Sequence, residues 1–349
     1  MSKNHISQII DSGNAKSFGF ISNGKKEVFC YTLTNKNGVE LSVINYGAII
    51  TALKIPVSNG NKVDVVLGFE NLEDYINSFN LPSAPYFGTV VGRYAGRIHK
   101  GHFTIGENHY LLNKNHGENH IHGGNKGLSK VLWEVKEIHT DENPTISLTY
   151  TSQSSDDNYP GELTVEVTYT LTESNELVVN FTAKSTEDTI INLTQHSYFN
   201  LDGHLNDILN QDLFVNSYKI LETTSELIPT GNYIDLKNHP FDFSKTKSCP
   251  SSIDNTFVLN NKNAAVLYSK KSNLKMLVST NQPAVHIYVG GNCFNQIKGK
   301  ESANYHPLSG ICFENQNFPD APNHNHFPNA ILKKDESYFH ETRFKFENL

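Results

Sequence analysis

The chain has 349 residues, of which 37% are apolar, including 20 Phe and 16 Tyr; this is enough for a large core. The length suits either two domains or one large all-β unit. A formal net charge of −7 and the lack of a dense Lys/Arg cluster argue against a partner that is nucleic acid or an anionic membrane surface.

Residues 1–15 are polar and have no clear period, so we expect a loose N-terminal tail. This segment lacks the apolar core of a secretory signal, and no stretch approaches the roughly 18–20 apolar residues of a membrane span. The cysteines show no Cys-x-x-Cys spacing, so we expect reduced, structural thiols in a cytoplasmic protein. They are Cys30, Cys249, Cys293 and Cys312.

Short apolar runs rich in Val, Ile and Tyr follow, separated by turn sequences. Asn37-Gly38 and Asn59-Gly60 are typical of the turns that join two strands of a hairpin. Residues 164–171 alternate polar and apolar side chains, as a half-buried antiparallel strand does. The runs expected to form strands are residues 28–31, 39–45, 49–55, 63–69, 132–138, 146–150, 163–171 and 177–184.

Helical patterns are few and short, and residues 71–77 are expected to form about two turns of helix. Many short strands with few helices predict an all-β fold, either a β-sandwich or a barrel. No fixed repeat is visible, which weighs against a propeller. Because no linker or low-complexity stretch marks a boundary, residues 16–349 are predicted to form a single domain.

The first run that could form part of a functional site is rich in glycine and spans residues 86–101. Gly88, Gly92 and Gly96 recur every four residues, and glycine permits tight turns and the close approach of a ligand. No Gly-Lys-Ser/Thr follows, so this is not a phosphate loop. Arg93 and Arg97 could each hold a sugar diol or carboxylate, or pair with a structural acid, and both alternatives stay open.

Two His-x-His patterns suggest a metal site. His120 and His122 have strand spacing and could face the same way, but Lys126 stands where a cupin would usually place a glutamate. His324 and His326 lie in a loop rich in Pro and Asn. Because the chain has 16 histidines, such pairs arise by chance, and we expect no bound metal.

Residues 192–201 are interpreted as a strand, in which alternation places Thr194, His196, Tyr198 and Asn200 on one face. An imidazole flanked by hydrogen-bonding and aromatic groups is typical of a wall that binds carbohydrate. The alternative is a core histidine satisfied by a backbone carbonyl, which is the more common situation for a single histidine.

Two later runs carry further polar groups. Asp254 stands at the start of an expected strand, where it either caps a turn or accepts hydrogen bonds from substrate hydroxyls. In residues 283–291, alternation places His286 and Tyr288 opposite the core-facing side chains. That core-facing set comprises Val285, Ile287 and Val289.

Glu314 lies within an apolar run near the C-terminus. Ile311 and Phe313 would share one face of this strand, while Cys312, Glu314 and Gln316 share the other. A carboxylate in such a run costs free energy unless it is paired, hydrogen-bonded or facing a wet cavity. A structural ion pair is the usual explanation for a lone glutamate, but three strands with polar, His- or Glu-bearing faces favour a shared cleft.

From about residue 31 to residue 346, short motifs occur in the same order as in one known protein family. The motifs are Asn45-Tyr-Gly-Ala, Asp64-Val-Val-Leu-Gly-Phe, Tyr86-Phe-Gly through Lys100-Gly, Asn119 through Gly124, Tyr159-Pro-Gly, Gln195-His-Ser-Tyr-Phe-Asn-Leu, Asp254-Asn-Thr-Phe, Gly299-Lys and Glu314-Asn-Gln-Asn-Phe-Pro-Asp-Ala. Each motif alone is weak. Together they resemble the galactose mutarotase (aldose 1-epimerase) family.

The resemblance implies one large antiparallel β-sandwich with a few short helices and an open sugar cleft. It implies interconversion of the α and β anomers of D-galactose or D-glucose, with neither a metal nor an organic cofactor. By position, Glu314 resembles the family's general base and His196 its general acid. His122 resembles a second active-site histidine, while Arg97 and Asp254 resemble residues that bind sugar hydroxyls.

Two positions depart from the family pattern. His286 stands where members carry Gln or an aromatic residue, and Gly96 replaces the asparagine of an Ala-Asn-Arg motif. Both departures bear on the preferred hexose and leave the reaction unchanged. From the strand faces described above, His286 and Tyr198 are also expected to bind substrate.

Two other functions stay open. A hexose-6-phosphate 1-epimerase would need a basic cluster at the rim of its site, for which the sequence offers only Arg93, Arg97 and Lys100. A non-catalytic sugar-binding homologue would have no need of the pair Glu314 and His196. The expected partner is a small aldohexose, and the protein is expected to be a monomer or a homodimer.

Overall fold

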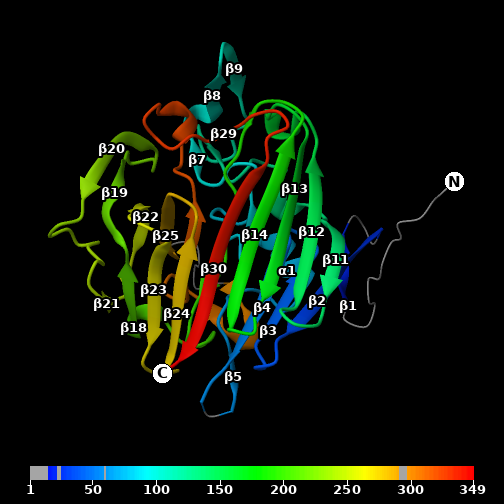
Figure 1. Cartoon of the computed structure of the whole chain (residues 1–349), viewed down its shortest axis with the longest axis vertical. Coiled ribbons are helices and arrows are strands. Elements are labelled where there is room, and N and C mark those ends of the chain that lie inside the picture. The colour runs from blue at the N-terminus through cyan, green and yellow to red at the C-terminus, as the bar shows by residue number, and fades with distance from the viewer. Residues whose placement is uncertain (1–14, 22–24, 59, 291–296) are drawn as a thin grey trace.

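The computed structural model describes residues 15–21, 25–58, 60–290 and 297–349. Within these ranges the chain forms antiparallel sheets, short 3₁₀ turns and one α-helix, which confirms the predicted all-β class. In Figure 1, β30 of the largest sheet runs beside β14 and β24. The nine strands of this sheet are, in spatial order, β11 (Glu134–His139), β12 (Thr145–Ser152), β13 (Leu163–Leu171), β14 (Glu176–Ser185), β30 (Tyr338–Asn348), β24 (Leu274–Thr280), β23 (Asn263–Ser269), β18 (Gln211–Val215) and β21 (Lys247–Ser248).

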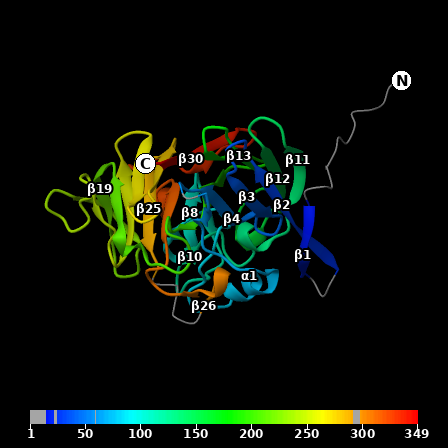
Figure 2. The same cartoon turned by 90° about the horizontal axis from the view of Figure 1, so that it is seen from below.

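Two smaller sheets pack against the largest one. Figure 2 shows β30 and β13 along one side of the molecule, β3 and β4 beneath them, and the helix α1 (Leu72–Ser78) beyond. The five-stranded sheet has the order β1 (Ala15–Ile21), β2 (Lys26–Thr34), β3 (Glu40–Ile44), β4 (Ile49–Pro56) and β5 (Lys62–Asp64). The six-stranded sheet has the order β17 (Tyr198–Phe199), β28 (Ile311–Gln316), β25 (Ala284–Val289), β22 (Ile253–Leu259), β19 (Ser217–Thr223) and β20 (Pro229–Asp235).

Short two-stranded ladders connect the three sheets. They matter for function because Arg97 of β7, Ile121 of β10 and His196, which follows β16, line the cavity described below. The pairs are β6 (Val90–Val91) with β16 (Thr194–Gln195), β7 (Arg97–Ile98) with β10 (His120–Ile121), β8 (His102–Ile105) with β9 (Asn108–Leu111), β15 (Thr189–Ile190) with β29 (Ile331–Leu332), and β26 (Ile297–Lys298) with β27 (Asn304–Tyr305).

A single apolar cluster joins the three sheets. Every second side chain of β13 is buried, from Leu163 to Leu171, as the alternating sequence predicts. These side chains belong to the same cluster as Leu41 of β3 and Ile287 of β25. Each smaller sheet therefore turns one face toward this core, and the opposite face of the six-stranded sheet is left for polar side chains.

The predicted hairpins and helix are confirmed in the N-terminal part. The Asn37-Gly38 turn joins β2 to β3, and Gly38 has φ of +81°, which favours glycine. Gly60 lies between β4 and β5, while Asn59 falls outside the described residues. The helix α1 begins after Asn71, whose side chain accepts a hydrogen bond from the N–H of Asp74.

The strand predicted over residues 63–69 is wrong beyond Asp64. The backbone N–H of Val65 binds the carbonyl of Leu53, but the N–H of Leu67 binds the carbonyl of Tyr198. This segment passes from one sheet to another, so it cannot continue a regular ladder with either. An apolar run alone does not distinguish such a crossing from a strand.

The expected N-terminal tail falls mostly outside the described residues, which begin at Ala15. Ala15 itself opens β1 and pairs with Tyr31, a strand that the polar sequence does not predict. Cys30, Cys249 and Cys312 are free thiols, as expected, and Cys293 lies outside the described residues. In the described part of the chain, no helix is long and apolar enough to cross a membrane.

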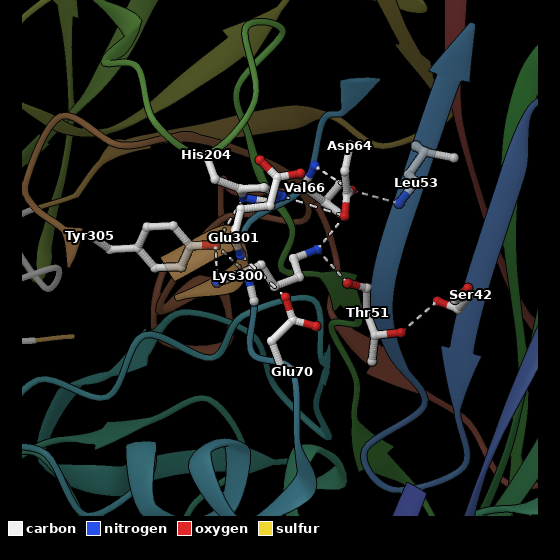
Figure 3. Close-up of polar contacts among 11 residues, drawn as sticks. Ser42, Thr51, Leu53, Asp64, Val66, Glu70, His204, Lys300, Glu301 and Tyr305 are labelled. Carbon is white, nitrogen blue, oxygen red and sulfur yellow. Dashed lines mark hydrogen bonds and ion pairs between the residues drawn. The ribbon is translucent and has the colours of Figure 1, made fainter. Parts of the chain in front are cut away.

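A buried ion pair ties the segment around β26 and β27 to the five-stranded sheet (Figure 3). The Lys300 ammonium lies 2.7 Å from an oxygen of Asp64 and donates to the carbonyl of Thr51. Burial by itself would raise the pKa of Asp64, but the charge of Lys300 and the contacts with His204 outweigh it and hold that pKa well below its usual range. Burial lowers the pKa of Lys300, and the charge of Asp64 opposes that shift.

The residues around this ion pair also contact the aromatic side chains next to His196. The backbone N–H of Lys300 donates to the hydroxyl of Tyr305, and the Tyr305 ring packs edge-on against Phe87. Phe87 in turn packs against Tyr198, whose ring lies 5.3 Å from that of His196. A chain of aromatic contacts thus runs from the ion pair to a histidine of the cavity.

Replacing Lys300 by Met is expected to lower the free energy of unfolding by about 3–5 kcal/mol, because Asp64 would stay buried without its cation. The double variant Asp64→Asn/Lys300→Met should recover part of that loss, since it leaves no uncompensated charge. Urea denaturation measures both. A loss below about 1 kcal/mol in the single variant, the range of exposed pairs, would contradict a buried structural pair.

Candidate active site

A cavity of about 260 Å³ opens over the face of the six-stranded sheet that points away from the core. Strands β28, β25 and β22 form its floor, and loops from the glycine-rich run and from residues 116–125 form its walls. The polar and aromatic residues that line it include Tyr86, Arg97, His122, His196, Thr223, Asp254, Thr256, His286, Tyr288, Glu314 and Gln316.

Glu314 reaches the cavity because β28 alternates as predicted. Ile311 and Phe313 are buried in the apolar core, while Glu314 and Gln316 point the other way and line the cavity. Cys312 is on the same face but is buried in a separate apolar cluster with Tyr198. No Lys or Arg forms an ion pair with Glu314 among the described residues. A structural salt bridge to a basic residue therefore does not explain why Glu314 is buried.

The neighbouring strands carry the next polar row, also as predicted. On β25, His286 and Tyr288 line the cavity, and the alternate side chains are buried. Asp254 lies at the start of β22, and its carboxylate oxygen is 2.9 Å from Nε2 of His286. Burial would raise the pKa of Asp254, but the hydrogen bond to His286 and the charges of His286 and Arg97 hold that pKa below its usual value.

The wall predicted from residues 194–200 was wrong for all members except His196. The sheet register keeps Tyr198 on the same face as Cys312 and Glu314, but the rings of Phe87 and Tyr288 pack against it. The hydroxyl of Thr194 donates to the carbonyl of Asn315, and Asn200 binds buried backbone carbonyls. Tyr198, expected to bind substrate, is fully buried behind His196 and does not line the cavity.

His196 and Glu314 face each other at the base of the cavity. Nε2 of His196 lies 3.5 Å from Oε1 of Glu314, and about 5% of each side chain is exposed. Nδ1 of His196 lies 3.7 Å from the thiol sulfur of Cys312, so Nε2 is the ring nitrogen that faces the carboxylate. A carboxylate and an imidazole placed in this way can accept and donate protons on one small molecule.

His122 is held by two backbone contacts with Gly96. The N–H of Gly96 donates to Nδ1 of His122, and the N–H of His122 donates to the carbonyl of Gly96. Burial, together with the charges of His196 and Arg97, holds the pKa of His122 well below its usual value. The ring is therefore neutral, and because Nδ1 is an acceptor, its single hydrogen is on Nε2.

The spacing of three cavity residues would suit a cation: one ligand atom each from His122, His196 and Glu314 lie within 4.8 Å of one another. The hydrogen bond from Gly96 opposes that use. Nδ1 of His122 already accepts the Gly96 N–H, and Nε2 carries the hydrogen, so neither nitrogen offers a free lone pair. The donor set fits a neutral hydrogen-bond donor better than a metal ligand.

Two polar atoms at the cavity lack a partner among the described residues. They are Nε of Arg97 and Oε1 of Gln316, and both are buried. Leaving a buried polar group unpaired costs about 1–3 kcal/mol, which a ligand with hydroxyl groups would recover. Sequence reasoning singled out Arg97 but gave Gln316 no role, although its place on the same strand face as Glu314 could have identified it.

Tyr86 is a further cavity residue that sequence reasoning missed. Its ring packs 5.1 Å from that of His122 and 6.0 Å from that of His196. It lies in the glycine-rich run, where the arginines drew attention. An aromatic wall beside polar groups suits a ligand with apolar faces and polar edges, as sugars have.

Arg93 and His120, whose roles the sequence left open, both make structural contacts. The Arg93 guanidinium donates to four backbone carbonyls and to the hydroxyl of Ser152. The two ring nitrogens of His120 contact the carbonyl of Asn113 and the hydroxyl of Tyr159. Because β10 ends at Ile121, His120 points into the protein while the next histidine points into the cavity.

The second His-x-His pair lies away from the cavity. Nε2 of His326 contacts the carbonyl of Gly231, and His324 lies 3.4 Å from a carboxylate oxygen of Asp320. Both rings pack against Phe327. These contacts account for the two residues as packing groups of the loop that follows β28.

Comparisons with known proteins agree with this site. The family model described as aldose 1-epimerase matches residues 30–345. A galactose mutarotase from Bos taurus is 38% identical over 321 residues, which cover 88% of this chain and 91% of the bovine protein. An aldose 1-epimerase from Streptococcus thermophilus is 32% identical over 335 residues, which cover 91% of this chain and 94% of that protein.

Solved structures are similar over nearly the whole chain. An aldose epimerase homologue from C. elegans gives a TM-score of 0.85 at 27% identity, covering 92% of this chain and 99% of the other. A galactose 1-epimerase from Lactobacillus acidophilus gives 0.83 at 28% identity, covering 96% and 98%. The predicted large antiparallel β-sandwich of this type is confirmed.

Proposed function

The chain belongs to the aldose 1-epimerase family and is an isomerase that interconverts sugar anomers, and from this premise we propose that it acts on D-galactose or D-glucose, with Glu314 as general base and His196 as general acid. The facing pair supports the proposal most directly: Nε2 of His196 lies 3.5 Å from Oε1 of Glu314 at the base of a polar cavity. The names of the relatives support galactose as a substrate.

The reaction follows from these two groups. Glu314 takes the proton of the C1 hydroxyl while the bond from C1 to the ring oxygen breaks, leaving a C1 aldehyde. Protonated His196 gives the hydrogen on Nε2 to the ring oxygen, so no charge accumulates on the sugar. The aldehyde end rotates about C1–C2, and the ring closes on its other face with the two proton transfers reversed. Each positioned proton donor or acceptor typically contributes about 10²–10⁴-fold.

The other cavity residues hold the sugar. Arg97 offers an unpartnered Nε–H, and the neutral His122 offers its Nε2–H. Asp254 is a carboxylate that accepts hydrogen bonds from hydroxyls. Gln316 contributes an acceptor oxygen, and Tyr86 an aromatic surface. The set offers both donors and acceptors, as recognition of several hydroxyl groups requires.

Polarimetry of freshly dissolved α-D-galactose and α-D-glucose tests this function. The protein is expected to accelerate the decay of optical rotation above the spontaneous rate in proportion to its concentration. Saturable binding of galactose without that acceleration would identify a non-catalytic sugar-binding homologue instead, and the proposal would fail.

Glucose 6-phosphate as a competitor distinguishes the related epimerase of hexose phosphates. Among the described residues that line the cavity, only Arg97 and Lys130 are Arg or Lys. The guanidinium of Arg93 is fully engaged elsewhere, and Lys100 does not line the cavity. We therefore expect weak competition, whereas inhibition tighter than that by glucose itself would favour a phosphosugar substrate.

Removal of metal ions is expected to leave the activity unchanged, because the neutral His122 offers no free lone pair to a cation. Dialysis against EDTA followed by polarimetry measures this, with metal-free buffer as the control. Loss of activity that zinc restores would show that the Gly96 contact opens and that the three residues bind metal.

A further inference from the structure

His286 has both ring nitrogens engaged by side chains of the neighbouring strand. Nε2 lies 2.9 Å from a carboxylate oxygen of Asp254, and Nδ1 lies 2.9 Å from the hydroxyl oxygen of Thr256. Asp254 and Thr256 both belong to β22 and both line the cavity. His286 therefore has no ring nitrogen left for a sugar hydroxyl, although the sequence predicts that it binds substrate.

The register of the sheet places His286 at the centre of the site. Strand β25 lies between β22 and β28, and His286 is directly opposite Thr256 on one side and Glu314 on the other. Side chains at such paired positions have Cβ atoms about 4.5–5.5 Å apart. The imidazole thus stands between the hydroxyl-binding carboxylate and the general base.

We propose that His286 is a positioning residue, which orients Asp254 and Thr256 toward the sugar and does not bind the sugar itself. This inference rests on the proposed function, since its ligand is the aldohexose. The N–H at Nε2 donates to one oxygen of Asp254 and fixes the carboxylate, so that the other oxygen is directed to a sugar hydroxyl. A carboxylate held in this way binds with less loss of rotational freedom.

The contact with Thr256 gives the arrangement a second property. Nε2 faces a carboxylate, so it carries a hydrogen in both protonation states. In the imidazolium, Nδ1–H donates to the oxygen of Thr256, and the hydroxyl hydrogen is free for the sugar. In the neutral ring, Nδ1 accepts that hydrogen, and Thr256 presents only lone pairs. The protonation state of His286 therefore decides whether Thr256 is a donor or an acceptor toward the cavity.

The charges around His286 favour the imidazolium. Burial would lower the pKa of His286, but the hydrogen bond to Asp254 and the charges of Asp254 and Glu314 outweigh it and raise that pKa, while Arg97 opposes them. At a pH below the pKa of His286, the contact with Asp254 is an ion pair. As the pH rises above that pKa, the contact weakens to a hydrogen bond from a neutral ring. The remaining titratable groups that line the cavity are three histidines, two tyrosines and a lysine: His116, His122, His196, Tyr86, Tyr288 and Lys130.

Matched amide variants separate the two contacts. In His286→Gln the amide nitrogen falls near the position of Nε2 and can still donate to Asp254. In His286→Asn it falls near Nδ1 and can reach only Thr256. Polarimetry on α-D-galactose is expected to give a KM raised about tenfold for His286→Asn and His286→Ala, the equivalent of one charge-assisted hydrogen bond. His286→Gln should stay within about threefold, and kcat should change less than KM in all three.

Two further measurements exclude a merely structural role. The KM of the wild type should rise with pH as His286 loses its proton, and His286→Gln should not show this rise. In an Asp254→Ala background, His286→Ala should add little, because a residue that acts through another has nothing left to position. Thermal unfolding of each variant shows that the comparison is made between folded proteins.

Equal KM values for the Gln and Asn variants, or multiplying losses in the double variant, would overturn the proposal and make His286 a direct sugar ligand or a packing residue. These outcomes are distinct from failure of the proposed function. If the wild type does not accelerate mutarotation, the function itself is wrong. If Glu314→Gln abolishes activity while the His286 variants keep a normal KM, only the positioning role is wrong.

Discussion

Replacing Glu314 by Gln is expected to lower kcat by about 10³–10⁴-fold, near the upper end of what one positioned proton acceptor contributes. The amide has almost the shape of the carboxylate, so the packing of β28 against the core through Ile311 and Phe313 should persist. What is lost is the ability to take the proton of the C1 hydroxyl. The KM for galactose should change much less, because the groups that hold the other hydroxyls remain.

The measurement is polarimetry with the spontaneous rate subtracted, at saturating α-D-galactose. Glu107→Gln is a matched control, since Glu107 is an exposed residue between β8 and β9, away from the cavity. It should keep full activity. A Glu314→Gln enzyme with a nearly normal kcat would show that another group, or solvent, removes the proton.

Replacing His196 by Ala is expected to lower kcat by about 10²–10³-fold, because the ring oxygen would leave as an alkoxide without a proton donor. Combined with Glu314→Gln, the loss should be little greater than in the worse single variant, since both residues act on one proton path. If the two losses multiply instead, the residues act in independent steps.

His120 provides a matched histidine control for this experiment. It is buried and hydrogen-bonded like an active-site residue, yet its ring contacts only Asn113 and Tyr159 and does not line the cavity. His120→Gln should lower the melting temperature and leave kcat of the folded enzyme close to that of the wild type. A fall in kcat to the level of His196→Ala would mean that loss of structure, not of a proton donor, explains both variants.

Regular alternation made much of the fold predictable. Strands β11 to β14 lie within two residues of their expected ends. Side chains alternate throughout β13 and along the second half of β14. The longest strand, β30, was not predicted, although it lies at the middle of the largest sheet. Its buried face carries His340 and Thr342 as well as Phe344, so polar residues interrupt the apolar period. Nε2 of His340 contacts the hydroxyl of Thr342 on the same strand, and that hydroxyl donates to Thr280 of β24.

The site was predictable to the same extent and for the same reason. Glu314 and His286 lie on continuous strands, where the side-chain direction follows from the period. The expected partners of His196 failed because distant segments occupy them: Thr194 donates to the carbonyl of Asn315, and the Phe87 ring packs on Tyr198. Alternation alone does not reveal such contacts. The roles of Gln316 and Tyr86 depend on which loops close over the sheet, which is set by contacts between distant segments.

The interrupted strand that carries His196 also determines what can vary in this enzyme. Before the break, Thr194 is hydrogen-bonded to the backbone of Asn315; after it, Tyr198 pairs with Cys312, and both partners flank Glu314 on β28. The distance between the proposed acid, His196, and the proposed base, Glu314, is thus set by contacts with one strand, β28. The walls of the cavity come from separate loops. Selection can therefore reshape the walls to accept another hexose without disturbing the proton path, so that substrate preference and chemistry can evolve as independent traits.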